Sequence, residues 1–140
     1  MFLHLRKSKT LLVDWIKKQV EKPFGFYIFV IPLYLLEAFM EPFFDITHAL
    51  IDDWFNFSFS IVLFFYGFLL IALGDIFWKS LKKIKKKALI IGIIAFFAQV
   101  FIWLFLEDGF VVHFMEALLK VVNIWSWVLV LFAYAAAYLN

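Results

Sequence analysis

Long apolar runs alternate with charged segments along this chain, and the runs have the length needed to cross a membrane. A helix needs roughly 20 apolar residues to cross about 30 Å of lipid hydrocarbon. A strand with an open edge would leave its backbone N–H and C=O groups unpaired in lipid. We therefore predict an all-α fold, an integral membrane bundle of four transmembrane helices with amphipathic interfacial segments. The predicted spans cover residues 24–40, 55–74, 88–106 and 117–139.

The start of the fourth span is compatible with two positions. Lys120 and Asn123 interrupt its apolar pattern, and polar groups inside lipid are costly. Either the helix crosses the membrane from about residue 117, or the stretch 110–119 lies along the outer interface.

Two charged stretches beside the spans are amphipathic, with apolar side chains at helical spacing opposite lysines, as is typical of helices on a membrane surface. One lies in a cytoplasmic basic segment, 1–23, that precedes the membrane domain, 24–140. Its apolar side holds Leu11, Leu12, Trp15 and Ile16, opposite Lys17, Lys18 and Glu21. The other precedes the third span and has Phe77, Leu81 and Ile84 on one face. We expect both on the inner leaflet, as ordinary basic flanks or as specific lipid-binding segments.

The distribution of basic residues predicts the orientation, because loops rich in Lys and Arg stay in the cytoplasm. Twelve of the thirteen Lys and Arg residues lie in 6–22 and 79–87, whereas the formal charges in the loops 41–54 and 107–116 are all acidic. We therefore expect a multi-pass protein of the bacterial inner (cytoplasmic) membrane with both termini in the cytoplasm. The first apolar run has no small-residue cleavage site, so we expect it to remain in the mature protein.

The composition supports a lipid environment and excludes several classes of function. Hydrophobic residues make up 66% of the 140 residues, while a soluble domain is about 45–50% apolar. The absence of cysteine excludes disulfides and thiol catalysis. No pattern indicates a metal site, a bound cofactor or nucleic-acid binding. The bilayer itself is the first partner that the sequence predicts.

Stripes of small and polar residues predict which side of each helix packs against other helices, since small residues let helices approach closely in lipid. The second span has Asn56, Ser60, Leu63, Gly67 and Gly74. The third has Ala88, Gly92, Ala95 and Gln99, and the fourth has Ser126, Ala133 and Ala137. Tryptophans near the predicted interfaces are expected to form an aromatic belt. They are Trp54, Trp78, Trp103 and Trp125.

Three polar residues within the apolar spans have alternative interpretations. Asn56 and Gln99 are compatible with hydrogen bonds between helices or with the polar wall of a substrate tunnel. Glu37 is the only carboxylate inside an apolar span, and acids at membrane depth are candidates for functional sites. Glu37 lies near the outer end of its span, so its side chain is also compatible with extension to the interface.

The loop before the second span places a histidine and two acids at the mouth of a helix. Asp52 and Asp53 directly precede that helix, where a carboxylate caps free N–H groups and interacts favourably with the helix dipole. The alternative is an outward-facing polar site in which His48 and these acids hold a sugar hydroxyl, because a His–Asp pair can accept a proton from an alcohol.

Several motifs in this region resemble a known family. They are Asp-Asp-Trp-Phe-Asn-Phe at 52–57, Phe-Phe-Tyr-Gly-Phe-Leu-Leu at 64–70, and Asp-Ile-Phe-Trp at 75–78 followed by a basic loop. Together they resemble the bacterial integral-membrane acyltransferases that modify extracytoplasmic glycans (acyltransferase family 3), in the branch of glucan biosynthesis protein C. The resemblance extends over the chain and is strongest from Thr47 to Lys87.

The resemblance implies that an acyl group passes from an acyl-CoA donor to an extracytoplasmic glycan or glucan. Members of that family have about ten spans, so the chain would be an internal or C-terminal-half fragment whose partner is the remainder of the enzyme. The family's catalytic histidine and donor-binding arginines match no segment here, and we assign no catalytic residue. Substrate-facing candidates remain His48, Asp52, Asp53, Asn56 and Glu37. The alternatives are a non-catalytic scaffold or assembly subunit, and a small four-helix transporter.

Overall fold

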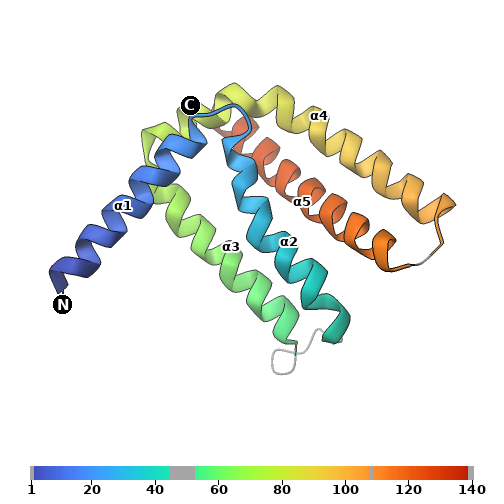
Figure 1. The fold of residues 1–140 in the computed structure, drawn as a ribbon. Helices are drawn as coiled ribbons and strands as arrows, with labels where there is room; N and C mark the ends of the chain where they lie inside the picture. Colours follow the sequence, from blue (N-terminus) through green and yellow to red (C-terminus); the bar gives the residue numbers. More distant parts are fainter. Residues whose placement is uncertain (1, 45–52, 108, 139–140) are drawn as a thin grey trace.

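The structure, a computed structural model, describes residues 2–44, 53–107 and 109–138 and contains only helices within those ranges (Figure 1). The α-helices are α1 (Phe2–Val20), α2 (Val30–Phe39), α3 (Trp54–Leu73), α4 (Asp75–Phe105) and α5 (Phe110–Tyr138). Two short 3₁₀ helices flank α2, η1 (Gly25–Phe29) before it and η2 (Glu41–Phe43) after it. Four segments are long and apolar enough to cross a membrane: Gly25–Phe43, Trp54–Leu73, Asp75–Phe105 and Phe110–Tyr138. The predicted all-α membrane bundle is confirmed.

The first span begins with an irregular turn rather than with a regular α-helix. Phe24 has a left-handed backbone with φ 69°, and the next residue, Gly25, packs against the end of α1. A Cβ atom on Gly25 would lie 1.7 Å from the carbonyl oxygen of Gln19, so only glycine fits. Pro32 follows in the first turn of α2, where the missing N–H has no partner within that helix.

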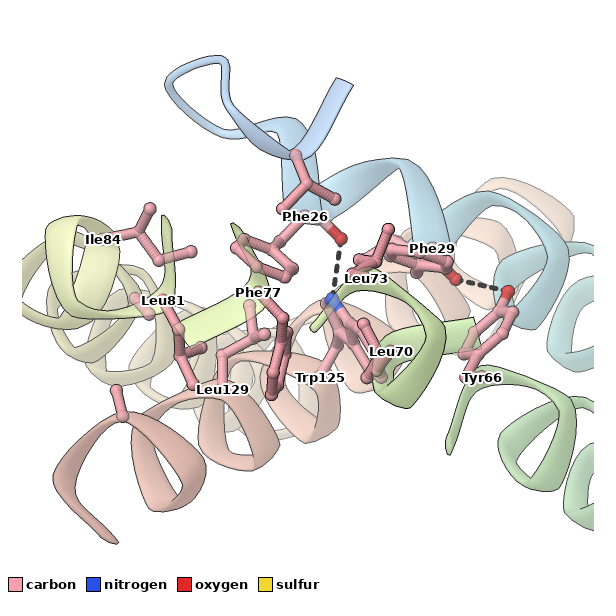
Figure 2. Close-up of a cluster of buried hydrophobic side chains, with 14 of the residues drawn as sticks. Phe26, Phe29, Tyr66, Leu70, Leu73, Phe77, Leu81, Ile84, Trp125 and Leu129 are labelled. Atoms are coloured by element: carbon pink, nitrogen blue, oxygen red, sulfur yellow. Dashed lines mark hydrogen bonds between the residues drawn. The ribbon is translucent and has the colours of Figure 1, made fainter. Parts of the chain in front are cut away.

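Side chains from other helices complete the hydrogen bonding of this turn (Figure 2). The indole Nε1 of Trp125 donates a 2.8 Å hydrogen bond to the carbonyl oxygen of Phe26, and the Tyr66 hydroxyl donates one of 2.8 Å to that of Phe29. Trp125 is only 1% exposed. Its predicted place in an aromatic belt is therefore wrong, because its N–H is used inside the bundle. Three other tryptophans are exposed as expected: Trp54, Trp78 and Trp103.

α4 joins the lysine-rich stretch and the third span in one unbroken helix. It has 31 residues, roughly 46 Å at 1.5 Å per residue, and follows Gly74, whose φ of 57° reverses the chain after α3. The predicted apolar face of Phe77, Leu81 and Ile84 is buried. This face packs into the core instead of lying on a separate surface helix. α5 is likewise continuous from Phe110, so the stretch 110–119 belongs to the helix that contains the fourth span.

α4 and α5 run side by side (Figure 1) and pack through the small residues that the sequence indicates. Ala88, Gly92 and Ala95 on α4 are buried, as are Ser126 and Ala133 on α5. A Cβ atom on Gly92 would lie 3.3 Å from the Cβ of Ser126. Ala137, at the end of the predicted α5 stripe, is exposed.

The small-residue stripe of α3 does not face the other helices. Ser60 and Gly67 are exposed, and a Cβ atom on Gly67 would meet nothing within 4 Å. The buried side of α3 instead carries large residues: Phe55, Tyr66, Leu70 and Leu73. The Tyr66 ring contacts the Phe29 ring at a centroid distance of 4.8 Å. Large side chains of this kind, rather than small residues, connect α3 to the bundle.

α1 contacts the bundle through its last turns. Ile16 and Val20 are buried in the core, whereas Leu11, Leu12 and Trp15 are exposed. The apolar side predicted for this segment is thus divided between the core and the surroundings of the protein.

Candidate functional site: a polar cavity between three helices

A cavity of about 420 Å³ lies between α2, α4 and α5, toward the end of the bundle where α2 and α4 end and α5 begins. We call this end the acidic end, because Glu41 and Glu107 lie there, and the opposite end, with the lysines of 79–87, the lysine-rich end. The cavity is lined by Glu37, Glu41, Phe96, Gln99, Val100, Trp103, His113, Glu116, Ala117, Lys120 and Asn123.

Helical spacing brings these residues together. On α5 the lining positions recur every three or four residues from His113 to Asn123, so they share one face of the helix. On α4, Gln99 and Trp103 are one turn apart. Since the two helices run side by side, their polar faces border a common space.

An ion pair between α2 and α5 lies in this cavity. The Lys120 ammonium forms a salt bridge with the Glu37 carboxylate. The Glu37 side chain is 5% exposed and the Lys120 side chain 41%. Lys120 lies roughly 15 Å along α5 from Phe110, well inside a span. The Glu37 carboxylate is thus buried against a cation from another helix, within the bundle.

His113 ties α5 to α2 beside the ion pair. Its Nε2 lies 3.2 Å from the carbonyl oxygen of Ala38, and because a carbonyl only accepts, the ring nitrogen must carry the proton in this hydrogen bond. Ala38 directly follows Glu37 in α2. The contact therefore holds the backbone of α2 in place next to the charged pair.

Asn123, a residue of the lining on α5, carries a buried hydrogen-bond acceptor beside the cavity. The Oδ1 atom of Asn123 is buried and has no hydrogen-bond partner in the described parts of the chain. This atom is buried too deeply to contact a water or ligand in the cavity, and an unpaired buried acceptor costs about 1–3 kcal/mol. Gln99 faces the same space from α4, as the substrate-wall interpretation of this residue requires.

The charges in the lining favour ligands that donate hydrogen bonds. Three carboxylates, Glu37, Glu41 and Glu116, face one ammonium, Lys120. Carboxylates accept hydrogen bonds from hydroxyl or ammonium groups and donate none when ionised. Within residues 2–44, 53–107 and 109–138, no three His, Asp or Glu side chains are grouped as a metal site.

The acids predicted at the mouth of the second span have a different role from the cavity residues. Asp53 is the N-cap of α3: its Oδ1 accepts from the Asn56 backbone N–H at 3.0 Å and its Oδ2 from the Asn56 Nδ2 at 2.7 Å. The capping interpretation is confirmed for Asp53, and Asn56 bonds within its own helix end rather than to another helix. Neither residue lines the cavity. His48 and Asp52 lie outside the described residues.

Glu37 and Gln99 are identifiable from the sequence, whereas the residues that α5 contributes to the cavity were not predicted. Lys120 is the one basic residue outside the two basic blocks, and its isolation in an apolar span was the available signal. The three- and four-residue spacing of His113, Glu116, Lys120 and Asn123 was a second signal.

No protein-family model matches the chain, and no curated protein or solved structure matches it either. The fold and the cavity define a class: a multi-pass membrane protein whose spans enclose charged and polar side chains.

Proposed function

We propose that this chain forms part of a membrane O-acyltransferase that moves an acyl group from an acyl-CoA donor to a hydroxyl of an extracytoplasmic glycan. In this proposal the cavity between α2, α4 and α5 holds sugar hydroxyls of the acceptor. The observation that carries it is a polar cavity of about 420 Å³ within an otherwise apolar bundle.

The chemistry of the lining suits a hydroxyl-rich ligand. A sugar hydroxyl both donates and accepts hydrogen bonds. The carboxylates of Glu37 and Glu116 supply acceptors, while the Lys120 ammonium supplies donors. Trp103 adds an aromatic surface to the same lining.

The proposed orientation agrees with this use of the cavity. If the lysine-rich end faces the cytoplasm, as the distribution of basic residues favours, the acidic end and its cavity face the extracytoplasmic side, where the glycan lies. The proposed location is the bacterial inner membrane, with both termini in the cytoplasm. The cavity residues are given binding roles only, and the groups that perform acyl transfer belong to a second polypeptide or to the remainder of the enzyme.

The test is ester formation on periplasmic glucan, measured by mass spectrometry with acetyl-CoA and succinyl-CoA as donors. Membranes containing this chain alone are compared with membranes that also contain the polypeptide encoded beside it. Transfer only in the second case supports the proposal. Transfer by the chain alone would mean that it holds the catalytic groups, and no transfer with both polypeptides folded would contradict the proposal.

Substitutions in the cavity make the test specific. Gln99→Leu removes an amide from the lining of the cavity and is expected to reduce transfer about tenfold or more, the scale of a lost hydrogen bond of about 1.4 kcal/mol. Ser60→Leu is the matched control, since it removes an exposed polar residue from α3, outside the cavity. Equal transfer activity of the two variants would contradict the binding of the acceptor in this cavity.

A small four-helix transporter is the second candidate, and the buried Glu37–Lys120 pair favours it. A pair of this kind can open when a proton or a cationic substrate replaces the lysine at the carboxylate. Proton-coupled efflux of a cationic dye from vesicles tests this function with Glu37→Gln. Efflux that this substitution leaves unchanged would exclude Glu37 as the coupling residue.

A further inference from the structure

A second pocket, of about 220 Å³, lies at the lysine-rich end between the turn after α1 and the first part of α4. It is separate from the polar cavity, and no residue lines both. Its lining consists of Val20, Glu21, Lys22, Pro23, Ser80, Lys83, Ile84 and Lys87.

The pocket is basic because one face of α4 supplies it. Four lining residues lie on one side of this helix, because three of them follow Ser80 by three, four and seven residues. They are Ser80, Lys83, Ile84 and Lys87. The charged residues of the lining are three lysines, Lys22, Lys83 and Lys87, and one acid, Glu21. The neighbouring lysines Lys79, Lys82 and Lys86 do not line the pocket. All six of these lysines are exposed.

Two of the pocket lysines, Lys87 and Lys22, make local contacts. The Lys87 ammonium lies over the ring of Phe24, 4.9 Å from its centroid. The Lys22 ammonium donates a 3.0 Å hydrogen bond to the Oε1 of Gln19. Ser80 is 3% exposed, so a hydroxyl group lies at a buried position of the lining. The turn that carries Lys22 is itself fixed by the close approach of Gly25 to α1.

The position along α4 indicates where a ligand of this pocket lies. Lys87 is the last charged residue before the apolar run 88–106, so we expect the pocket at the boundary between the polar and hydrocarbon layers. Phosphate groups of lipids lie at this depth, and basic pockets between membrane helices bind anionic headgroups. Ammonium and hydroxyl groups are both donors to phosphate oxygens.

We propose that this pocket binds a phosphate group, with Lys83, Lys87 and Lys22 as its cationic donors and Ser80 as a neutral one. The group belongs either to the headgroup of an anionic membrane lipid or to a soluble phosphate compound. This inference does not depend on the proposed acyltransferase function, because it concerns other residues at the opposite end of the bundle.

The test uses the full chain in nanodiscs of phosphatidylcholine, with phosphatidylglycerol or inorganic pyrophosphate added and binding followed by the thermal unfolding midpoint. The pocket variant is Lys83→Gln with Lys87→Gln. The control is Lys82→Gln with Lys86→Gln, which removes the same charge at the same spacing from the same helix but outside the pocket.

The pocket variant is expected to weaken binding about tenfold or more, while the control binds as the unmodified chain does. A response to phosphatidylglycerol assigns the site to a lipid headgroup, and a response to pyrophosphate alone assigns it to a soluble phosphate. Equal losses in the two variants, or no response to either ligand, would overturn the proposal. Lys83→Arg with Lys87→Arg keeps the charges and should retain binding, which separates loss of the site from loss of folding.

Discussion

Glu37 and Lys120 form an ion pair whose two members differ in exposure, since the carboxylate side chain is 5% exposed and the lysine side chain 41%. Removing one partner of a buried pair leaves the other charge uncompensated. Because the exposed lysine can be hydrated through the cavity and the buried carboxylate cannot, the two single substitutions should have unequal effects.

Lys120→Met is therefore expected to lower the free energy of unfolding by about 3 kcal/mol, and Glu37→Gln by much less. The double variant should be more stable than Lys120→Met alone, since no buried charge remains. Unfolding in mild detergent, followed by circular dichroism, measures all three. Equal losses from the two single substitutions would contradict the asymmetry.

Gly25→Ala should prevent the turn between α1 and the first span from forming as observed, because the new Cβ would collide with the Gln19 carbonyl at 1.7 Å. We expect a loss of about 3 kcal/mol or more. Gly67→Ala is the matched control on α3, where nothing lies within 4 Å and alanine favours the helix by up to about 1 kcal/mol. A tolerated Gly25→Ala would mean that the turn differs from the one described.

Trp125→Phe removes the indole donor but keeps a large aromatic ring in the core. The carbonyl oxygen of Phe26 then loses its 2.8 Å hydrogen bond from the side chain, and one hydrogen bond contributes about 0.5–1.5 kcal/mol to stability. Trp103→Phe should be almost neutral, because Trp103 is exposed. Thermal unfolding midpoints compare the two, and similar shifts would argue against a structural hydrogen bond at Trp125.

Gly92→Leu should force α4 and α5 apart. Even the first carbon of a side chain at this position would lie 3.3 Å from the Cβ of Ser126, and overpacking of this kind costs about 1–3 kcal/mol. Gly67→Leu adds the same atoms to an exposed face of α3. Cross-linking of cysteines introduced on α4 and α5 would report the separation, and efficient cross-linking in Gly92→Leu would count against the close packing.

Membrane orientation can be tested with single cysteines, since the chain has none of its own. Glu107→Cys at the acidic end should react with a membrane-impermeant maleimide added to intact cells. Lys86→Cys at the lysine-rich end should react only after the membrane is opened. The reverse labelling pattern would place the polar cavity on the cytoplasmic side and contradict the proposed acceptor site.

The sequence predicts the number of spans and the packed face of α4 because both depend on the local order of residues. Phe77, Leu81, Ala88 and Ala95 recur at helical spacing, and burying one of them on a continuous helix places the others on the same side. α3 shows where such reasoning ends. Its small residues and its large residues each form a stripe, and the sequence of α3 does not show which stripe is buried. Tyr66 faces inward because it packs against Phe29 of η1 and Trp125 of α5.

The candidate site was predictable in part for the same reason. Glu37 is identifiable as a lone acid in an apolar run, but its pairing with Lys120 joins residues on helices far apart in the sequence. Asp53 could be interpreted as a cap because capping is a local interaction. The roles proposed for His48 and Asp52 remain predictions, since these residues lie outside the described part of the chain.

The hydrogen bonds from Trp125 and Tyr66 to the turn of the first span have a consequence for the order of biogenesis. Ribosomes make the chain from its N-terminus, so the carbonyl groups of Phe26 and Phe29 enter the membrane before their donors on α5 and α3 have been synthesised. Each of these carbonyl groups lies in helical backbone, where it accepts a backbone N–H, and the side chain adds a second hydrogen bond to the same oxygen. The turn of this span thus gains its last hydrogen bonds only when the fourth span arrives.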